Sequence, residues 1–465
     1  MMPQMCLTDA ALQFGGTLIN PDGYFSAVSI NSRTTNVGDL FVAIEGENFD
    51  AHSYLSTIAD KISGAVVSRP NKALDIPQWV VQDTTKALGD LARLRRDSFQ
   101  GTVVALTGSS GKTSVKEAIS IILSQTYEVH ATSGNLNNHF GVPLTLLAMD
   151  TKTDIAVIEM GASAIGEIDY LSSIAQPDIA LVNNAQSAHI EGFGSLKAIA
   201  LAKAEIYKSL KSDGTAVLNL DQPWVEQWLE IIGERNCISF SITEERADLF
   251  AKNIKDTGDG CFSFDLCINQ KIAGAFAEQK VRLSHPGIHS ISNGLAAAAC
   301  AFAAGAGLTE IAYGLENVAL IPGRLQHKVL SDNCVVIDDS YNANPDSFKT
   351  AIDVLSKANS HRILVMGDMG ELGDHAKELH REVGLYAKNA KIDSLYAVGA
   401  NSEIASQEFM GQHFPDQAAL IDSLKAQIIE LEASHESVII LVKGSRSSAM
   451  ENVIQALFSG EKSSC

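Results

Sequence analysis

The sequence predicts an α/β protein of three domains. Over most of its length, short apolar runs rich in β-branched residues alternate with stretches of helical periodicity, which is the pattern of mostly parallel sheets covered by helices. A glycine-rich turn, Thr107–Thr113, lies between one such run and one such helix. The chain of 465 residues is long enough for about three hydrophobic cores.

Residues 1–84 predict a small N-terminal α/β domain of short strands and turns. The polar turn Asn31-Ser32-Arg33 follows the apolar residue Ile30. A helix is expected over Thr84–Ser98, because its leucines recur on one face, and the first domain boundary is placed at its start. The candidate strands are Leu40–Ile44, Ala65–Val67 and Trp79–Val81.

Residues 85–321 predict a central domain with a mostly parallel sheet. Thr102–Leu106 is its first strand, and helical spacing begins at Ser114. A helix is expected over Ile288–Ala304, and Ile321-Pro322-Gly323 ends the domain. The last few candidate strands have no helices between them and are expected to form an antiparallel extension. The strands expected after the first are Glu128–Thr132, Ile155–Ile158, Ile179–Val182, Thr215–Leu220, Cys237–Ser241, Leu249–Ile254, Cys261–Cys267 and Lys280–Leu283.

Residues 322–465 predict a second doubly wound, Rossmann-like unit. Open α/β sheets bind ligands at the carboxyl ends of their strands, and in both units those ends carry the unusual residues. The strands expected here, each followed by a helix, are Val335–Asp338, Ile363–Met366, Ser394–Val398 and Val438–Val442.

Composition narrows the possible partners and compartments. A net charge of −20 argues against nucleic acid and anionic membranes as partners. Seven scattered cysteines without a Cys-x-x-Cys pair favour reduced thiols in a cytoplasmic protein. The first ten residues lack the pattern of a signal peptide, and the longest apolar stretch, Leu295–Ala306, is too short to span a bilayer.

The turn Thr107–Thr113 predicts a nucleoside triphosphate site. Gly108 and Gly111 allow the main chain to approach an anion, and Lys112 adds a positive charge. Thr113 offers a hydroxyl to a phosphate-bound Mg²⁺. The usual phosphate loop has a further glycine where this chain has Leu106, so a simple strand-to-helix turn is the alternative interpretation.

Three further residues, which follow this turn in the sequence, are candidates for metal chemistry. Glu159 ends a predicted strand, where an acidic side chain commonly holds Mg²⁺ or its water, although a surface carboxylate is the alternative. His189 follows the next strand and is otherwise an ordinary loop histidine. Lys203 lies on the apolar face of a helix expected over Leu196–Leu210. It either extends its amine past the core to solvent or is held inward, where burial would favour reaction with CO₂ to give a carbamate.

In the last domain, polar loops follow three strands. Asp338–Pro345 gathers acidic and amide groups before a proline, which suits a sugar hydroxyl or a zwitterionic ligand, with a helix N-cap as the alternative. Met366–Gly373 and Val442–Arg446 combine glycine with charge.

Together these stretches resemble the Mur ligase family, which forms amide bonds at the expense of ATP in peptidoglycan precursor synthesis. The resemblance extends over essentially the whole chain. The last two of its hallmark strings are typical of the member that adds D-alanyl-D-alanine, and the Asp-Asn-Pro-Arg string of the diaminopimelate-adding member does not occur. The strings are Ala105–Thr113, Gly134–Asn138, Asp339–Pro345 and Lys443–Arg446.

The resemblance implies a role for each candidate. Lys112, Glu159, His189 and a carbamylated Lys203 would be catalytic, with two Mg²⁺ ions held by Thr113 and Glu159 and by His189 and Lys203. Residues implied to bind ATP are Thr107, Gly108, Ser109, Ser110, Gly111, Lys112, Thr113, Asn293, Arg324 and Asp339. The residues implied to bind the UDP end of a UDP-N-acetylmuramoyl-tripeptide are Ser32, Arg33, Gly46 and His52. Those implied to bind its peptide are Asn135, Asn137, Asn138 and His139. Those implied to bind the dipeptide are Tyr341, Asn342 and Asn344.

Two positions depart from the family pattern. Asn31 stands where the first-domain string usually has aspartate, which puts the role of that carboxylate in doubt. Ser290 follows His289 where asparagine is usual, so Asn293 is the stronger candidate for adenine.

The implied reaction joins the tripeptide carboxylate to the amine of D-alanyl-D-alanine through an acyl phosphate, in a cytoplasmic monomer whose domains close on substrate. Two other interpretations remain open. One is a folylpolyglutamate-synthase-like ligase, which conjugates glutamate and needs no UDP-binding domain. The other is a nucleotide-gated binding or regulatory protein, whose ATP hydrolysis would need no acceptor.

Overall fold

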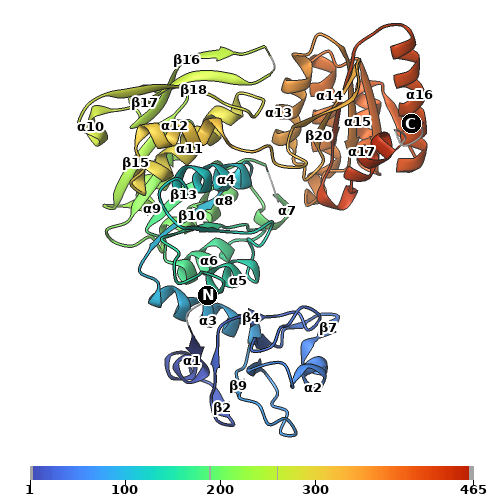
Figure 1. Ribbon diagram of the computed structural model, residues 1–465. Helices are drawn as coiled ribbons and strands as arrows, with labels where there is room; N and C mark the ends of the chain where they lie inside the picture. The colour runs from blue at the N-terminus through green and yellow to red at the C-terminus, as the bar shows by residue number, and fades with distance from the viewer. Residues whose placement is uncertain (1–3, 188–189, 259, 460–465) are drawn as a thin grey trace.

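The computed structural model describes residues 4–187, 190–258 and 260–459, and it confirms the α/β class. Three successive units run from the N-terminal part of the chain to its C-terminal part, each built on its own main sheet (Figure 1). The expected boundaries near residues 84 and 321 fall at the start of α3 (Thr84–Ser98) and between α12 (Leu308–Glu316) and β19 (Gln326–Ser331). That each of these boundaries separates independent domains stays a prediction.

The N-terminal sheet has the strand order β2-β9-β8-β5-β4, and its pairs are parallel except β2 with β9. The three predicted strands correspond to β5, β8 and β9. The short strands around them carry no apolar run and were not predicted. The strands are β1 (Met5–Cys6), β2 (Thr17–Ile19), β3 (Tyr24–Phe25), β4 (Val28–Ser29), β5 (Leu40–Val42), β6 (Glu45–Gly46), β7 (Phe49–Asp50), β8 (Gly64–Val67) and β9 (Gln78–Val80), and the helices are α1 (Leu7–Phe14) and α2 (Leu55–Ile58).

Helix α3 spans the predicted Thr84–Ser98 and joins the first unit to the central one. Its start is set by Asp83, whose carboxylate accepts hydrogen bonds from the backbone N–H groups of Thr85 and Lys86. Leu88 and Leu91 of α3 belong to a core that also contains Trp79 of the first sheet. The helix therefore packs the two units against each other.

The central sheet has the order β11-β12-β10-β13-β14-β15-β16-β17-β18. Its strands are β10 (Thr102–Thr107), β11 (Val129–Ala131), β12 (Ile155–Glu159), β13 (Ile179–Val182), β14 (Thr215–Asn219), β15 (Asn236–Ser241), β16 (Leu249–Asp256), β17 (Phe262–Ile268) and β18 (Ala277–Arg282). Its helices are α4 (Lys112–Leu123), α5 (Gly141–Leu147), α6 (Glu167–Ala175), α7 (Ile190–Phe193), α8 (Leu196–Ala204), α9 (Val225–Ile232), α10 (Gln270–Ala273), α11 (His289–Ala303) and α12.

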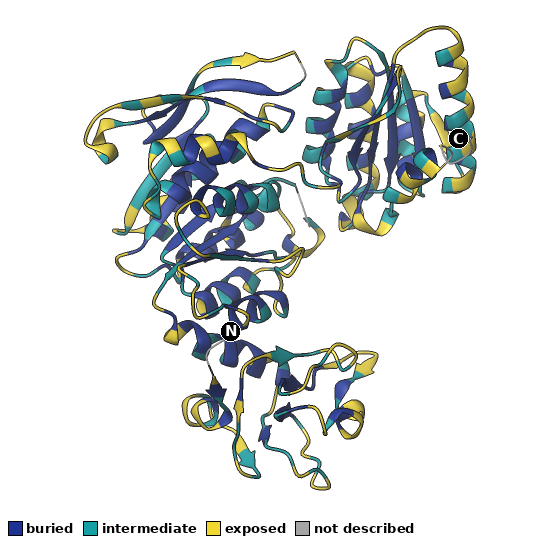
Figure 2. Cartoon of the chain, viewed as in Figure 1, coloured by how far each residue is buried: buried dark blue, intermediate teal, exposed yellow. Residues whose placement is uncertain are grey.

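Alternate residues of the central strands enter cores on opposite faces of the sheet. Val103 and Ala105 of β10 pack with α3, α5, α6 and α8, whereas Val104 and Leu106 pack with α4, α11 and α12. Both faces are covered, which explains the unbroken apolar runs of these strands. Figure 2 shows the strands buried beneath helices whose outer faces are exposed.

The expected antiparallel extension is correct only for β16, β17 and β18. Strand β15 pairs with β16 in parallel, through Phe240 with Leu249 and Ser241 with Phe250. The prediction did not foresee this pairing, because a parallel connection usually needs a helical crossover and here only a short loop intervenes. The short helix α10 also lies between β17 and β18, where no helix was expected.

The third sheet has the order β19-β20-β24-β21-β22-β23 and is parallel except for β19 with β20. The four predicted strands are β20, β21, β22 and β24. The edge strands β19 and β23 were missed because their residues are largely polar and half-exposed. The elements after β19 are β20 (Cys334–Asp339), β21 (His361–Gly367), β22 (Ser394–Val398), β23 (Gln412–Phe414), β24 (Val438–Lys443), α13 (Pro345–Ser356), α14 (Ala376–Asn389), α15 (Ser402–Phe409), α16 (Gln417–Ala433) and α17 (Glu451–Phe458).

Among the residues that the structure describes, none of the helices has both the length and the apolar character required to cross a membrane.

Candidate active site

A cavity of about 1630 Å³ lies at the carboxyl ends of strands from the central and third sheets. Most of the sequence-predicted site residues line it, although they come from segments far apart in the chain. These residues are Ser109, Ser110, Gly111, Lys112, Thr113, Asn135, Asn137, Asn138, His139, Glu159, Asn293, Arg324, Asp339, Tyr341, Asn342 and Asn344.

The predicted phosphate loop connects β10 directly to α4. Gly111 has a φ of +75° and caps α4, which begins at Lys112. Free N–H groups at this helix N-terminus therefore face the cavity, as anion binding requires. The Lys112 amine donates a hydrogen bond to the carbonyl oxygen of Gly108 at 2.7 Å. Burial lowers the pKa of Lys112 and nearby Arg324 lowers it further, while Glu159 opposes the shift.

Two residues after β13 fix the serines of this loop, and the sequence analysis did not assign them a role. The Asn184 side chain accepts a hydrogen bond from the backbone N–H of Ser110, and its amide donates to the Ser110 carbonyl. The hydroxyl of Ser110 donates to Oε1 of Gln186 at 2.6 Å. Their signal in the sequence was the polar string that follows a strand in the same sheet as the loop.

Thr107 and Gly108 do not line the cavity. The Thr107 hydroxyl is buried and donates to the carbonyl oxygen of Met160 at 2.8 Å, which ties the end of β10 to the segment after β12. In this conformation the Thr107 hydroxyl therefore makes a structural contact, whereas the resemblance implied a contact with ATP.

Glu159 is buried, with 2% of its surface exposed, at the end of β12. Its Oε1 accepts a hydrogen bond from the Asn137 amide at 2.8 Å, and its backbone N–H donates to the Thr132 hydroxyl. Its Oε2 has no hydrogen-bond partner among the described residues. A buried carboxylate oxygen without a partner is costly, and coordination of a hard cation would satisfy it. The site therefore fits Mg²⁺, with the Thr113 hydroxyl on the same cavity wall.

Lys203 is also buried, with 1% of its surface exposed, near the end of α8. The alternative of an amine extended to solvent therefore does not apply. Burial lowers the pKa of Lys203 well below its ordinary value, and nearby Lys112 adds to this shift. The amine lies 5.9 Å from the centre of the Phe193 ring. The helix predicted to reach Leu210 ends at Ala204 and continues as a 3₁₀ turn, Glu205–Tyr207. His189 lies outside the described residues.

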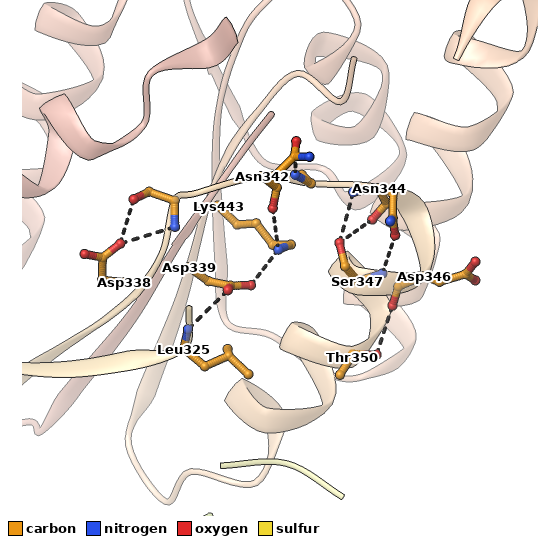
Figure 3. A network of polar contacts seen from close by, with 11 residues as sticks. Leu325, Asp338, Asp339, Asn342, Asn344, Asp346, Ser347, Thr350 and Lys443 are labelled. Atoms are coloured by element: carbon orange, nitrogen blue, oxygen red, sulfur yellow. Dashed lines mark hydrogen bonds and ion pairs between the residues drawn. The ribbon is translucent and has the colours of Figure 1, made fainter. Parts of the chain in front are cut away.

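The third sheet contributes a buried ion pair whose two residues line the cavity (Figure 3). Lys443 donates to Oδ2 of Asp339 at 2.6 Å and to the carbonyl oxygen of Asn342 at 2.9 Å. Oδ1 of Asp339 accepts from the backbone N–H of Leu325, which anchors the segment that carries Arg324. Burial raises the pKa of the Asp339 carboxyl, and Lys443 opposes this shift.

Arg324 bridges the two units. Its guanidinium lies over the Tyr341 ring at 4.5 Å, and its Nη2 donates to the Thr113 hydroxyl at 3.1 Å. A second bridge joins the backbone N–H of Ser187 to Oδ2 of Asp346 at 2.9 Å.

The side chains of Asn344 and Asn342 make hydrogen bonds within their own segment. For Asn344 this is the N-cap that the alternative interpretation predicted. Asn344 caps α13: its side chain accepts from the Ser347 N–H, while the Ser347 hydroxyl accepts from the Asn344 N–H. Oδ1 of Asn342 accepts from the N–H of Ala343. Both residues nevertheless line the cavity.

Asn293 of α11 contacts the phosphate loop. Its Oδ1 accepts from the Asn183 amide at 3.0 Å, and a Cβ on Gly111 would lie 2.4 Å from the same oxygen. Ser290 also lines the cavity, but its hydroxyl donates to the carbonyl oxygen of Pro286, which precedes α11.

The residues predicted in the first unit do not line the cavity. Oδ1 of Asn31 accepts from the backbone N–H of Arg33, a turn contact that an aspartate would make equally well. His52 is held between Asp50 and the backbone N–H of Ser68. Ser32 is half-buried and Gly46 is exposed. The structure thus leaves these residues apart from the phosphate loop.

The comparisons with known proteins agree with this architecture. The Mur ligase middle domain matches residues 106–301, and the Mur ligase glutamate ligase domain matches residues 323–446. The chain is 45% identical to the UDP-N-acetylmuramoyl-tripeptide--D-alanyl-D-alanine ligase of Escherichia coli (strain K12), over 95% of this chain and 96% of that protein.

Two solved structures are similar over nearly their whole length. MurF from Acinetobacter baumannii has a TM-score of 0.91 and 35% identity, covering 98% of this chain and 99% of that one. MurF ligase from Thermotoga maritima, solved in complex with ADP, has a TM-score of 0.80 and 29% identity, covering 94% and 97%. The chain belongs to the Mur ligase family.

Proposed function

We propose that this protein is an ATP-dependent ligase that adds D-alanyl-D-alanine to UDP-N-acetylmuramoyl-tripeptide, giving UDP-N-acetylmuramoyl-pentapeptide, ADP and phosphate. One observation carries the proposal: a phosphate loop, a buried acidic residue and a third-domain arginine meet in one cavity. Relatives with that activity match the chain over its first unit as well as the other two, which supports this ligase over one that needs no UDP-binding domain.

The reaction implied by the family has two steps, which the cavity groups would support. An oxygen of the tripeptide carboxylate attacks the γ-phosphorus of ATP and ADP leaves, which produces an acyl phosphate. The amine of the dipeptide then attacks the carbonyl carbon, loses a proton and expels phosphate. Lys112 and the N–H groups at the start of α4 hold the phosphates and reduce the repulsion between the two reacting anions. Arg324 reaches the same phosphates from the third domain.

Two Mg²⁺ ions are part of the proposal. When bound, they neutralise charge on the transferred phosphoryl group. Thr113 and Glu159 would hold one ion, and the unpartnered Oε2 of Glu159 supports this assignment. His189 and a carbamate on Lys203 would hold the other.

The carbamate forms when the Lys203 nitrogen bonds to the carbon of CO₂ and releases one proton. The reaction needs a neutral amine, and burial lowers the pKa of Lys203 and so favours that form. The product is an anion, so the modified side chain could act as a metal ligand.

The remaining assignments concern substrates and setting. We infer that Ser32, Arg33, Gly46 and His52 bind the UDP end, that Asn135, Asn138 and His139 face the peptide, and that Tyr341, Asn342 and Asn344 receive the dipeptide. Asn293 and Asp339 complete the ATP site together with Ser109 and Ser110. We also infer a cytoplasmic monomer, for which the acidic composition and the absence of Cys-x-x-Cys pairs are the support.

Phosphate release measured with each substrate omitted in turn tests the function. Release should require ATP, UDP-N-acetylmuramoyl-tripeptide and D-alanyl-D-alanine together. Release with folate and glutamate in their place would favour a folylpolyglutamate-synthase-like ligase. Release without any acceptor would instead identify a nucleotide-gated regulatory protein.

A further inference from the structure

The loop that follows β11 contains one residue whose surroundings differ from those of its neighbours. The structure describes all of Ser133–His139. Within this segment Asn137 is half-buried, and the other residues are exposed. Its expected role is contact with the muramoyl peptide, but its side chain points to another protein group.

Asn137 holds the end of β12 at two points. Its side-chain amide donates to Oε1 of Glu159 at 2.8 Å, and its carbonyl oxygen accepts from the backbone N–H of Gly161 at 2.8 Å. A Cβ on Gly161 would lie 2.9 Å from Oδ1 of Asn137, so a glycine allows the loop to approach this closely. The pair of contacts fixes the Asn137 side chain against the carboxylate.

This arrangement divides the two oxygens of Glu159 between two tasks. The amide occupies Oε1, and Oε2 is left buried without a partner in the described structure. A half-turn of the carboxylate about its last bond merely exchanges its two equivalent oxygens, and any other rotation would weaken or break the hydrogen bond to Asn137. The amide therefore selects one orientation of the group, with Oε2 directed to a ligand.

The same loop also lines the cavity with residues that the proposed function assigns to the tripeptide. Asn138 anchors it by accepting hydrogen bonds from the N–H groups of Phe140 and Gly141 at the start of α5. Asn135 and His139 line the cavity and are exposed. One short segment thus touches the acceptor side and the Glu159 carboxylate.

We propose that Asn137 is a positioning residue that orients Glu159 for a divalent cation and links this orientation to occupancy of the acceptor loop. The proposal rests on the proposed function for the identity of the acceptor, but not for the action of Asn137 on Glu159. Outer-sphere partners of metal ligands typically change metal affinity about 10- to 100-fold when removed.

The test uses Mn²⁺ as a spectroscopic probe, with free Mn²⁺ measured by electron paramagnetic resonance in the presence of a non-hydrolysable ATP analogue. Asn137→Ala should bind Mn²⁺ roughly 10-fold more weakly or worse. Asn135→Ala is the matched loop control: it should retain Mn²⁺ affinity and lose affinity for the tripeptide substrate. In a Glu159→Gln background, Asn137→Ala should have no further effect, because the group through which it acts is gone.

Kinetics supply a second readout. Raised Mg²⁺ should restore the turnover of Asn137→Ala, whereas the raised KM of Asn135→Ala for the tripeptide should not respond to Mg²⁺. Unchanged Mn²⁺ affinity in a folded Asn137→Ala, with weaker tripeptide binding, would overturn the proposal and return Asn137 to the substrate contacts. If Mn²⁺ affinity falls as expected but phosphate release needs no acceptor, the orientation of Glu159 stands and the proposed function fails.

Discussion

Lys112 and Lys203 are buried amines that differ in the charges around them. Burial lowers the pKa of Lys112, but Glu159 opposes this shift and the Gly108 carbonyl accepts a hydrogen bond from the amine. The environment of Lys203 combines burial with the positive charge of Lys112, and both favour the neutral amine. The first can serve as a phosphate-binding cation, and the second can react with CO₂.

Replacement of Lys203 by alanine should abolish ligase activity, because the carbamate can no longer form. A small carboxylic acid such as formate should restore part of the activity by occupying the vacated volume. The matched control is Lys208→Ala, which removes an exposed lysine on the following turn. This variant should retain its activity, and formate should not increase it. Full activity in Lys203→Ala would show that the buried amine is only part of the core.

Replacement of Lys112 by alanine should slow the first phosphoryl transfer by ~100-fold or more, since a positioned charge is lost from the transferring group. First-turnover ADP formation with ATP and the tripeptide, followed by rapid quench, measures this step. Circular dichroism should show an intact fold, because the amine makes a single hydrogen bond to Gly108. A normal burst of ADP would contradict the phosphate-binding role.

His289 predicts how stability depends on pH. Burial, with smaller contributions from His285 and Lys443, lowers the pKa of His289 to about 4, and its Nδ1 has no partner within the described chain. The unfolded state therefore binds a proton between the ordinary pKa of about 6.5 and the lowered one, while the folded state does not. Stability is present above this window and is lost as pH falls through it.

The expected loss between about pH 7 and pH 5 is about 2 kcal/mol from this group. Urea unfolding followed by tryptophan fluorescence measures it. His289→Gln, which carries no titratable ring, should reduce the pH dependence by that amount. An unchanged slope in the variant would assign the effect to other groups.

The sequence could predict the cavity residues that carry recognisable chemistry, but not their partners. Lys112, Glu159 and Asp339 were found because they stand at strand ends in strings that resemble known ones. Asn184 and Gln186 were not predicted, because in a sequence an amide that holds a loop by hydrogen bonds cannot be distinguished from any other polar loop residue. The contact of Asn137 with Glu159 depends on the register of β11 and β12, which no local pattern encodes.

At the scale of elements, the junction of β10 and α4 depends on the conformation of one glycine. Gly111 caps the helix at a φ of +75°, and Gly166 caps α6 in the same way at +88°. A Cβ on Gly111 would lie 2.4 Å from Oδ1 of Asn293, whereas one on Gly166 meets nothing within 4 Å. The two positions therefore share the backbone strain and differ in the steric contact.

Gly111→Ala should lose nucleotide affinity by about 10-fold or more, because the methyl group displaces Asn293 and the loop together. Gly166→Ala should show the strain alone, roughly 1–2 kcal/mol of stability, with nucleotide affinity retained. Calorimetric titration with ADP and thermal unfolding separate the two effects. Equal nucleotide affinity in the two variants would remove Asn293 from the site.

Elements with continuous apolar runs or clear helical periodicity were predicted to within a few residues. The exceptions are edge strands and irregular pairings. Strand β23 spans Gln412–Phe414 and gains its partners from β22, so its order comes from the sheet rather than from its own residues. The turn at Glu205–Tyr207 continues the predicted helix with tighter geometry, which periodicity alone cannot distinguish.

At the scale of the whole molecule, the cavity exists because the third unit packs against the central one. Arg324 with Thr113 and Asp346 with Ser187 make polar bridges between the two units. Lys357 of α13 also lies over the Phe262 ring of the central unit at 4.9 Å. These contacts are small compared with the apolar cores within each unit, so we expect the two units to open and close about them.

Asp346→Ala should therefore shift the protein towards an open form in the absence of ligands. Its carboxylate holds the segment after β13 through Ser187, and α13 retains its cap from Asn344. Small-angle X-ray scattering should show a larger radius of gyration, and the KM for D-alanyl-D-alanine should rise. Asp353→Ala is the matched control, because Asp353 on the same helix accepts its hydrogen bond from Tyr386 inside the third unit. Identical scattering from both variants would mean that the bridge at Ser187 does not hold the two units together, and closure would then depend on Arg324.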